Sequence, residues 1–285
     1  MASWKKFIII FLLILAAAAA VLLIAGTIRQ KKETSDMLKR LSCSPVRDST
    51  GLVDFSSLAG LPEPVQKYFR TVLREGQPLI SRTLLSQSGE LRINRETDKW
   101  SRFKAEQTVC VLRPGFIWNA IISIAPLMHV RVMDSYINGS GSGKVSLMSL
   151  LTVALEQDRP ELNSGALYRY LAEAVWYPTA LLPGPGIKWR AIDSRRATAT
   201  LTDKGISVSL EFRFNDSGEV AAIYTEDRYG QFDGSYKKYP WEGHFSKYET
   251  RNGIRIPMEA EVGWHLPEGW WLFWKGRIKA ADYEF

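Results

Sequence analysis

Residues 206–214 read ISVSLEFRF, a segment in which apolar side chains alternate with polar ones. A period of two is typical of a β-strand that has one face buried and the other in water. The neighbouring segments IKWRAID (187–193), RATATLTD (196–203) and EVAAIYTEDRY (219–229) alternate in the same way. Because residues that favour turns separate these segments, we expect consecutive antiparallel strands joined by hairpins.

Alternating runs of the same kind lie on both sides of this region. Toward the N-terminus they are LLSQSGELRI (84–93), KWSRFKAEQTVCVL (99–112) and LMHVRVMDSYING (127–139), and residues 239–285 add longer ones. A run of Gly and Ser at 139–143 follows the third of these, where we expect a flexible hairpin. A domain built from so many consecutive hairpins belongs to the mainly β class.

Helical periodicity occurs at three places, one before the strands and two that interrupt them. Residues 61–75 begin with prolines, carry apolar side chains three and four positions apart, and are followed by a glycine. Residues 149–157 and 165–176 show similar spacing, and Asn163-Ser164 is suited to cap the second of these helices. We therefore expect an α+β fold, in which a curled antiparallel sheet or half-barrel has helices packed in its concave face.

Residues 7–26, FIIIFLLILAAAAAVLLIAG, form an unbroken apolar run. About 20 such residues are what an α-helix needs to cross the hydrocarbon core of a bilayer. A cleavable signal peptide is the alternative, since Lys5 and Lys6 precede the run. Residues 21–24 are apolar and follow the alanines, where a signal peptide would end at small residues, so a retained anchor is favoured.

The chain is thus expected to have four parts. They are a short basic tail (1–6), a transmembrane helix (7–26), a juxtamembrane linker (27–57) and a β half-barrel domain (58–285) with a helical insertion near 149–176. Long domains cross a membrane largely regardless of the charges that flank the span. We therefore expect a single-pass protein whose C-terminal domain is extracytoplasmic.

The formal net charge of +7 is concentrated near the N-terminus. Residues 1–40 hold seven of the 37 basic residues and only two of the 30 acidic ones, so the rest of the chain is nearly neutral. Basic residues beside a membrane span are attracted to anionic lipid headgroups. The charge therefore indicates the lipid bilayer as a partner and gives no support to a nucleic-acid partner.

The two cysteines, Cys43 and Cys110, have neither zinc-ligand spacing nor a redox motif. Outside the cytoplasm they could pair. Cys43 falls in the expected linker and Cys110 at the end of an alternating run, so the sequence favours two free thiols over a disulfide. Cys43 also lies too far beyond the apolar run to be a lipoprotein cysteine.

No short motif indicates catalysis. His129, His244 and His265 stand alone, and the sequence contains no nucleophile elbow, phosphate-binding loop or dinucleotide fingerprint. We therefore expect a protein that is not an enzyme and that holds neither a metal nor a cofactor. An extracytoplasmic hydrolase that uses the carboxylates of Glu173 and Asp193 remains an alternative.

The concave face of a curled sheet that helices fill only in part could hold an apolar or amphipathic ligand. Arg169 and Glu173 lie four positions apart and can meet on one helix face, with Arg190, Asp193, Asp134 or Arg228 as further partners. The candidate ligand-binding residues are Trp118, Tyr136, Arg169, Tyr170, Glu173, Trp176, Trp189, Asp193, Trp241 and Trp264. For any single tryptophan, packing in the core or in a cross-strand pair is the favoured explanation. A non-enzymatic scaffold protein with a self-filled core is the main alternative function.

Trp270, Trp271 and Trp274 follow the turn at 267–269. They would either pack within a hairpin or contact a membrane interface, where tryptophan is favoured.

The segment LYRYLAEAVWYPTALLP (167–183) resembles the signature of a bacterial family of unknown function. Further elements in matching order are Leu61-Pro62-x-Pro64-Val65, Trp118, Asp134-x-Tyr136-x-x-Gly139-x-Gly141, Trp189-x-x-Ile192-Asp193, Ile256-Pro257 and Glu261-Val262-x-Trp264. The resemblance covers residues 61–285. It implies a protein anchored in the bacterial cytoplasmic (inner) membrane, whose periplasmic part looks like the LolA-like half-barrel of lipoprotein carriers. This family has no established activity, so the resemblance implies none for this chain.

Overall fold

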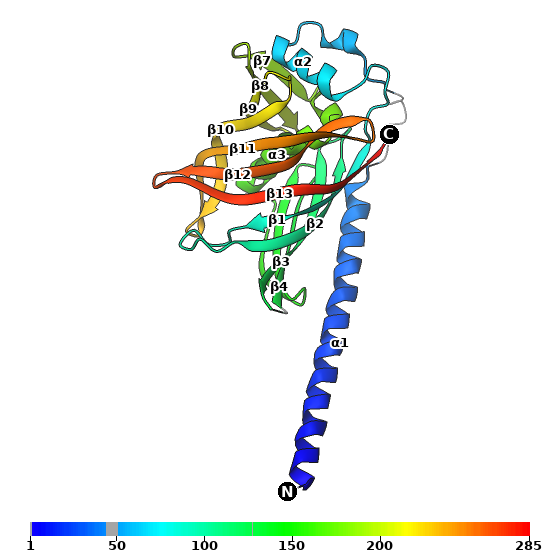
Figure 1. Cartoon of the computed structure of the whole chain (residues 1–285), viewed down its shortest axis with the longest axis vertical. Coiled ribbons are helices and arrows are strands. Elements are labelled where there is room, and N and C mark those ends of the chain that lie inside the picture. Colours follow the sequence, from blue (N-terminus) through cyan, green and yellow to red (C-terminus); the bar gives the residue numbers. More distant parts are fainter. Residues whose placement is uncertain (1, 44–50, 127) are drawn as a thin grey trace.

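The computed structural model describes residues 2–43, 51–126 and 128–285. Thirteen strands form one antiparallel sheet (Figure 1). The first six are β1 (Arg82–Leu91), β2 (Ser101–Cys110), β3 (Gly115–Ala125), β4 (Met128–Ile137), β5 (Ser140–Leu147) and β6 (Leu151–Gln157). The other seven are β7 (Ile187–Ala191), β8 (Arg196–Asp203), β9 (Ile206–Phe214), β10 (Val220–Phe232), β11 (Ser235–Arg251), β12 (Ile254–Leu266) and β13 (Gly269–Glu284).

The sheet is open between β6 and β7. Its order is β6-β5-β4-β3-β2-β1-β13-β12-β11-β10-β9-β8-β7. Strands that are consecutive in the chain therefore pair with each other, except β6 and β7, and β1 pairs with β13. Two-residue turns such as Asp233-Gly234 and Asn252-Gly253 connect long strands, with both residues at positive φ. Such turns match the right-handed twist of the strands that they join. The prediction of a curled antiparallel sheet is confirmed.

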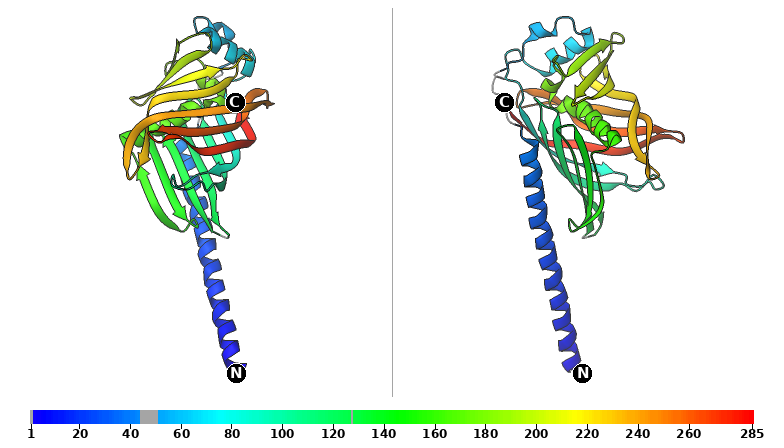
Figure 2. Two further views of the ribbon diagram at one scale, coloured as in Figure 1. Left: turned by 60° about the vertical axis from the view of Figure 1, so that its left-hand side comes forward. Right: turned by 180° about the vertical axis from the view of Figure 1, so that it is seen from behind.

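The connection between the two open edges passes through the concave face. It contains α3 (Pro160–Glu173) and two 3₁₀ turns, η2 (Ala174–Trp176) and η3 (Pro178–Leu181). The helix packs against β5, β9 and β10, and the view from behind in Figure 2 shows it inside the curl. Tyr170 of α3 and Tyr177 between the two 3₁₀ turns are fully buried.

The start of α3 differs from the prediction of a cap at Asn163-Ser164. The helix begins at Pro160, a position at which proline is favoured because its missing N–H would have no partner there. The Asn163 side chain instead accepts a hydrogen bond from the Gly141 amide, 2.7 Å away, and so ties the helix to β5.

The prediction of a helix at 149–157 is wrong, because these residues contribute strand β6. Leu151, Val153 and Leu155 lie two apart, which places them on one face of a strand. Pairing with β5 supplies their backbone hydrogen bonds, whereas a helix here would have lacked a surface on which to pack. A short apolar run does not distinguish the two structures by periodicity alone.

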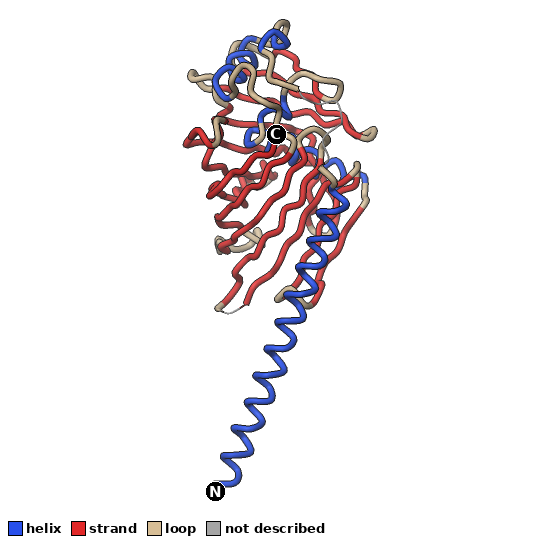
Figure 3. The backbone as a smooth tube through the Cα atoms, turned by 90° about the vertical axis from the view of Figure 1, so that its right-hand side faces the viewer, coloured by secondary structure: helices blue, strands red, loops and turns tan. Residues whose placement is uncertain are grey.

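The N-terminal helix α1 (Ala2–Leu41) extends well beyond the apolar run, through the first half of the expected linker. It is the one helix in the described residues that is long and apolar enough to cross a membrane. Its N-terminal part projects away from the domain, while its C-terminal part lies along the outside of the sheet (Figures 1 and 3). A second short helix, α2 (Glu63–Val72), follows a 3₁₀ turn, η1 (Phe55–Leu58), and buries Tyr68 and Phe69.

Polar and apolar contacts hold the C-terminal part of α1 against β3, β4 and β5. Glu33 forms ion pairs with Arg131 and Lys144, and Arg131 also donates a hydrogen bond to the Thr34 hydroxyl at 2.8 Å. Leu41 joins Ile117 and other residues of the outer face in a small apolar cluster. The helix and the domain therefore form one packed unit.

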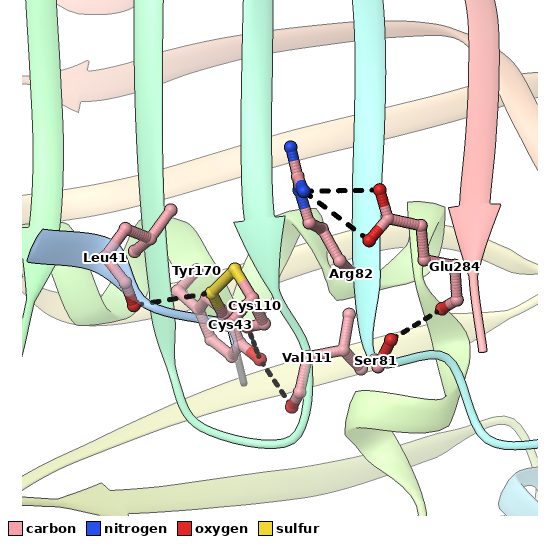
Figure 4. Close-up of a disulfide and its surroundings, with 8 residues drawn as sticks. All are labelled: Leu41, Cys43, Ser81, Arg82, Cys110, Val111, Tyr170 and Glu284. Atoms are coloured by element: carbon pink, nitrogen blue, oxygen red, sulfur yellow. Dashed lines mark hydrogen bonds and ion pairs between the residues drawn. A yellow bond between two sulfur atoms is a disulfide. The ribbon is translucent and has the colours of Figure 1, made fainter. Parts of the chain in front are cut away.

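Cys43 and Cys110 form a disulfide (Figure 4), so the prediction of two free thiols is wrong. Their Cα atoms lie 5.1 Å apart, within the usual range for a disulfide. The prediction placed Cys43 in a linker separate from the domain. Because α1 continues to Leu41 along the sheet, it brings Cys43 to the end of β2.

Candidate functional site

A cavity of about 670 Å³ lies between the concave face of the sheet and α3. This volume is in the range of sites that bind small molecules. Most of its wall is apolar, with aromatic rings from β3, η2 and β11–β13. They are Phe116, Trp118, Trp176, Tyr236, Trp241, Phe245, Trp264, Trp271, Phe273 and Trp274. Ile93, Gln231, Phe232 and Trp271 are shared with an adjoining open hollow beside Asp233.

Three of the tryptophans form a row across adjacent strands. Trp241 of β11 pairs in register with Trp264 of β12, which in turn pairs with Trp271 of β13. Directly opposed residues point to the same face of a sheet, so the three indoles line one side of the cavity. Trp271 and Trp274 pack against the core, whereas Trp270 is 40% exposed. The cluster after residue 269 thus packs mainly within its hairpin.

A chain of hydrogen bonds runs from Trp118 of β3 through β1 and β2 to Glu173 of α3. The Trp118 indole donates to Gln87 at 2.8 Å, Gln87 donates to Gln107 at 2.9 Å, and Gln107 donates to the Glu173 carboxylate. A polar chain in which every link is made fixes the side chains that take part. Glu173 is therefore held by Gln107 of β2 as well as by Arg169 of its own helix.

Arg169 lies at the centre of the polar part of the cavity. Its guanidinium donates to Glu173 at 2.6 Å and to Asp134 of β4 at 2.9 Å. It also lies over the rings of Phe116 and Trp118, at 5.2 and 4.7 Å from their centroids. Two carboxylates and two aromatic faces thus compensate one partly buried cation.

Burial shapes the protonation behaviour of this cluster. It raises the pKa of Asp134 above its usual value, although Arg169 opposes the shift. It lowers the pKa of Arg228 to about 10, and the nearby charge of Arg169 adds to that effect. Arg228 is nevertheless still a cation at neutral pH.

Six of the ten predicted ligand-binding residues line the cavity. They are Trp118, Arg169, Glu173, Trp176, Trp241 and Trp264. Asp134 and Arg228, expected only as charge partners, line it as well. Whether any of the six contacts a ligand stays a prediction.

The other four predicted residues lie outside the lining. Tyr136 and Tyr170 are fully buried and donate hydrogen bonds to Asp203 and to the backbone at the end of β2. Trp189 packs between aromatic rings of α2 and β9. Asp193 is a surface residue in an ion pair with Arg196 at 2.7 Å. Asp193 lies three residues before Arg196, which explains that pairing. Beside Arg169, where Asp193 was expected, the structure has Asp134.

Sequence reasoning missed Gln87 and Gln107. Both occupy inward positions of strands in which the other inward residues are mainly apolar, such as Leu85 and Ala105. A buried amide needs a hydrogen-bond partner, so a single glutamine at an inward position of an otherwise apolar strand face is a signal of a polar contact.

The comparisons with known proteins give a family and two solved structures of low similarity. Residues 59–283 match the family of unknown function DUF6920. A LolA superfamily protein from Nitrosomonas europaea is similar over 78% of this chain and 92% of its own, with 10% identity and a TM-score of 0.39. A beta-barrel-like protein with the DUF1849 domain, from Brucella abortus, is similar over 73% and 99%, with 8% identity and a TM-score of 0.23. No curated protein matches.

The family match covers the sheet, α3 and every residue that lines the cavity. This protein therefore belongs to the DUF6920 family.

Proposed function

We propose that this protein is anchored in a membrane by residues 7–26 and binds an apolar or amphipathic molecule, a lipid, inside its curled sheet. It acts by binding and catalyses no reaction. The observation that carries the proposal is the cavity of about 670 Å³, whose wall is largely aromatic and whose floor holds a charged cluster. An amphipathic molecule matches both parts, because its hydrocarbon suits the aromatic wall and its polar group suits the cluster.

The proposed location is the extracytoplasmic side of the bacterial inner membrane. Disulfides persist in oxidising compartments and are rare in the cytosol. The bond between Cys43 and Cys110 therefore supports a domain outside the cytoplasm. The length and hydropathy of α1 suit a membrane span.

Two alternatives from the sequence are weaker. A hydrolase that uses Glu173 together with Asp193 lacks support, since Asp193 lies on the surface and Glu173 lines the cavity. A scaffold protein with a self-filled concavity is hard to reconcile with the volume that the described side chains leave.

Native mass spectrometry of the full chain, released from detergent micelles, tests the proposal. We expect one lipid per chain in the wild type. Gly143→Leu should lose it, because Gly143 lines the cavity and its added side chain would start 3.5 Å from Asp134 and project beside it. Gly184→Leu is the matched control, since no described residue lies within 4 Å of a Cβ atom added there and Gly184 does not line the cavity. A wild type that retains no lipid, even after lipid is added, would favour the scaffold function.

A further inference from the structure

Three buried hydrogen-bond donors of residues in the cavity wall have no partner among the described residues. They are Nε of Arg228 and the indole Nε1 atoms of Trp241 and Trp271, all buried. Among the described residues that line the cavity, no buried side-chain acceptor lacks a partner. A buried donor without a partner costs free energy comparable to a lost hydrogen bond. The described cavity wall therefore has unpaired buried donors but no unpaired buried acceptor.

Arg228 differs from Arg169 in its electrostatic partners. Arg169 has two carboxylates within 3 Å, whereas no carboxylate of the described residues lies within 4 Å of Arg228. The Arg228 guanidinium instead lies 4.4 Å from the ring centroid of Trp241 and 5.0 Å from that of Trp264. Its one hydrogen bond within the described residues joins Nη2 to the Gly165 carbonyl at 3.2 Å.

A cation over two indoles is held in place but not neutralised. Cation–π contacts give a desolvated guanidinium less electrostatic stabilisation than a carboxylate or phosphate does. Removal of an arginine from water is costly unless an anion compensates it. The described residues supply a contacting anion to Arg169, whereas Glu173 and Asp134 act on Arg228 only from beyond 4 Å.

We infer that the cavity takes an acidic amphiphile, whose carboxylate or phosphate accepts hydrogen bonds from Arg228 while its hydrocarbon lies along the row of Trp241, Trp264 and Trp271. The inference rests on the proposed function and narrows it to one class of lipid. Carboxylate and phosphate share the chemistry that the site requires, namely anionic oxygens on a chain long enough to fill an aromatic cavity.

A matched pair of brominated probes tests the inference, because bromine quenches nearby indoles. Dibromostearic acid and dibromostearyl alcohol carry the same chain with and without the charge. Each is titrated into the full chain in phosphatidylcholine nanodiscs, with tryptophan fluorescence as the readout. We expect the acid to bind about tenfold more tightly than the alcohol, the usual effect of a hydrogen bond to a charged group.

Arg228→Gln should weaken binding of the acid about tenfold and leave the alcohol unchanged. Arg196→Gln, on the outer face, is the control and should change neither. Competition with hexadecyl phosphate and with inorganic phosphate separates a phospholipid headgroup from a free anion. Equal affinity of the wild type for acid and alcohol would overturn the inference and leave the proposed function intact. If neither probe binds, the result contradicts both the inference and the proposed function.

A separate surface carries a second inference. Leu151, Val153 and Leu155 on the free edge of the sheet are each more than half exposed, and Met128 near the β3–β4 turn is 45% exposed. An unpaired edge strand with apolar side chains is a surface that proteins usually cover.

The position of α1 indicates what covers this edge. A side chain at Gly26, the last residue of the apolar run, would collide with Leu150 in the β5–β6 turn. The strand tips also reach part of the way down the helix on its outer side (Figure 3). If residues 7–26 cross a bilayer, β6 starts where that bilayer ends.

We propose that β6 lies in the headgroup region of the bilayer that α1 crosses. The packing of Glu33, Arg131 and Lys144 and the disulfide fix the helix to the domain, so the edge cannot turn away from the membrane. At this depth, leucine and valine side chains leave water and are buried at the boundary between the headgroups and the acyl chains.

A fluorophore on Val153→Cys, in the full chain in phosphatidylcholine vesicles, tests this contact. Spin-labelled lipids should quench it strongly, while the same fluorophore on Ser56→Cys, in the 3₁₀ turn η1 before α2, should not be quenched. Unquenched Val153 in a membrane-retained protein would overturn the contact, and a disulfide-linked dimer through Val153→Cys would show that a second copy covers the edge. Protein that stays free of the vesicles would instead contradict the anchor.

Discussion

Cys43→Ser is expected to lower the free energy of unfolding by about 4 kcal/mol, because the disulfide joins residues 67 apart and removes the loop-closure entropy of that segment from the unfolded chain. For a domain of this size, such a loss corresponds to a fall of roughly 10 °C in the melting temperature. The measurement is thermal unfolding of the full chain in detergent, with and without reductant.

Reductant supplies the control for this variant. The wild type in reductant should melt close to Cys43→Ser, and the variant itself should not respond to reductant. Cys43 is the better of the two positions to change, since Cys110 is buried beside Leu41 and a serine there would add an unrelated cost. A variant that melts with the oxidised wild type would contradict a stabilising role of the bond.

The fold could be predicted from the sequence wherever each strand has one face in the core. ISVSLEFRF at 206–214 is such a case, because its alternation follows directly from the burial of Val208, Leu210 and Phe212 in β9. The edge strand β6 could not be predicted in this way. Its residues are nearly all exposed, so burial imposes no pattern on them, and its identity depends on pairing with β5.

The candidate site shows the same limit. Aromatic residues and the spacing of Arg169 and Glu173 indicated a lined concavity with a charged pair. The partner of Arg169 is Asp134 rather than Asp193, because register places β4, and not the turn after β7, opposite α3. Likewise, the disulfide depends on where α1 ends relative to β2, which no local pattern in the sequence encodes.

Arg169→Met is expected to destabilise the protein by about 3 kcal/mol, because it leaves Asp134 and Glu173 in the cavity wall without their cation. This is the low end for a broken buried ion pair, since 35% of the Asp134 side chain remains accessible from the cavity. Arg196→Met is the matched control. It breaks an ion pair of the same type with Asp193, in which both side chains are 43% exposed, and should cost less than 1 kcal/mol.

The pH dependence distinguishes lost charge compensation from lost packing. Burial already raises the pKa of Asp134 in the folded protein, and Arg169 opposes that shift, so the substitution raises the pKa further. A carboxyl whose folded-state pKa is raised favours the folded state below its unfolded value, near 3.8, and loses that contribution as pH rises through the folded value. The deficit of Arg169→Met relative to the wild type should therefore be smaller at pH 5 than at pH 8, as measured by denaturant unfolding at both values. A deficit that is equal at the two values would mean that Arg169 stabilises the wall through its contacts with Phe116 and Trp118 and not through its charge.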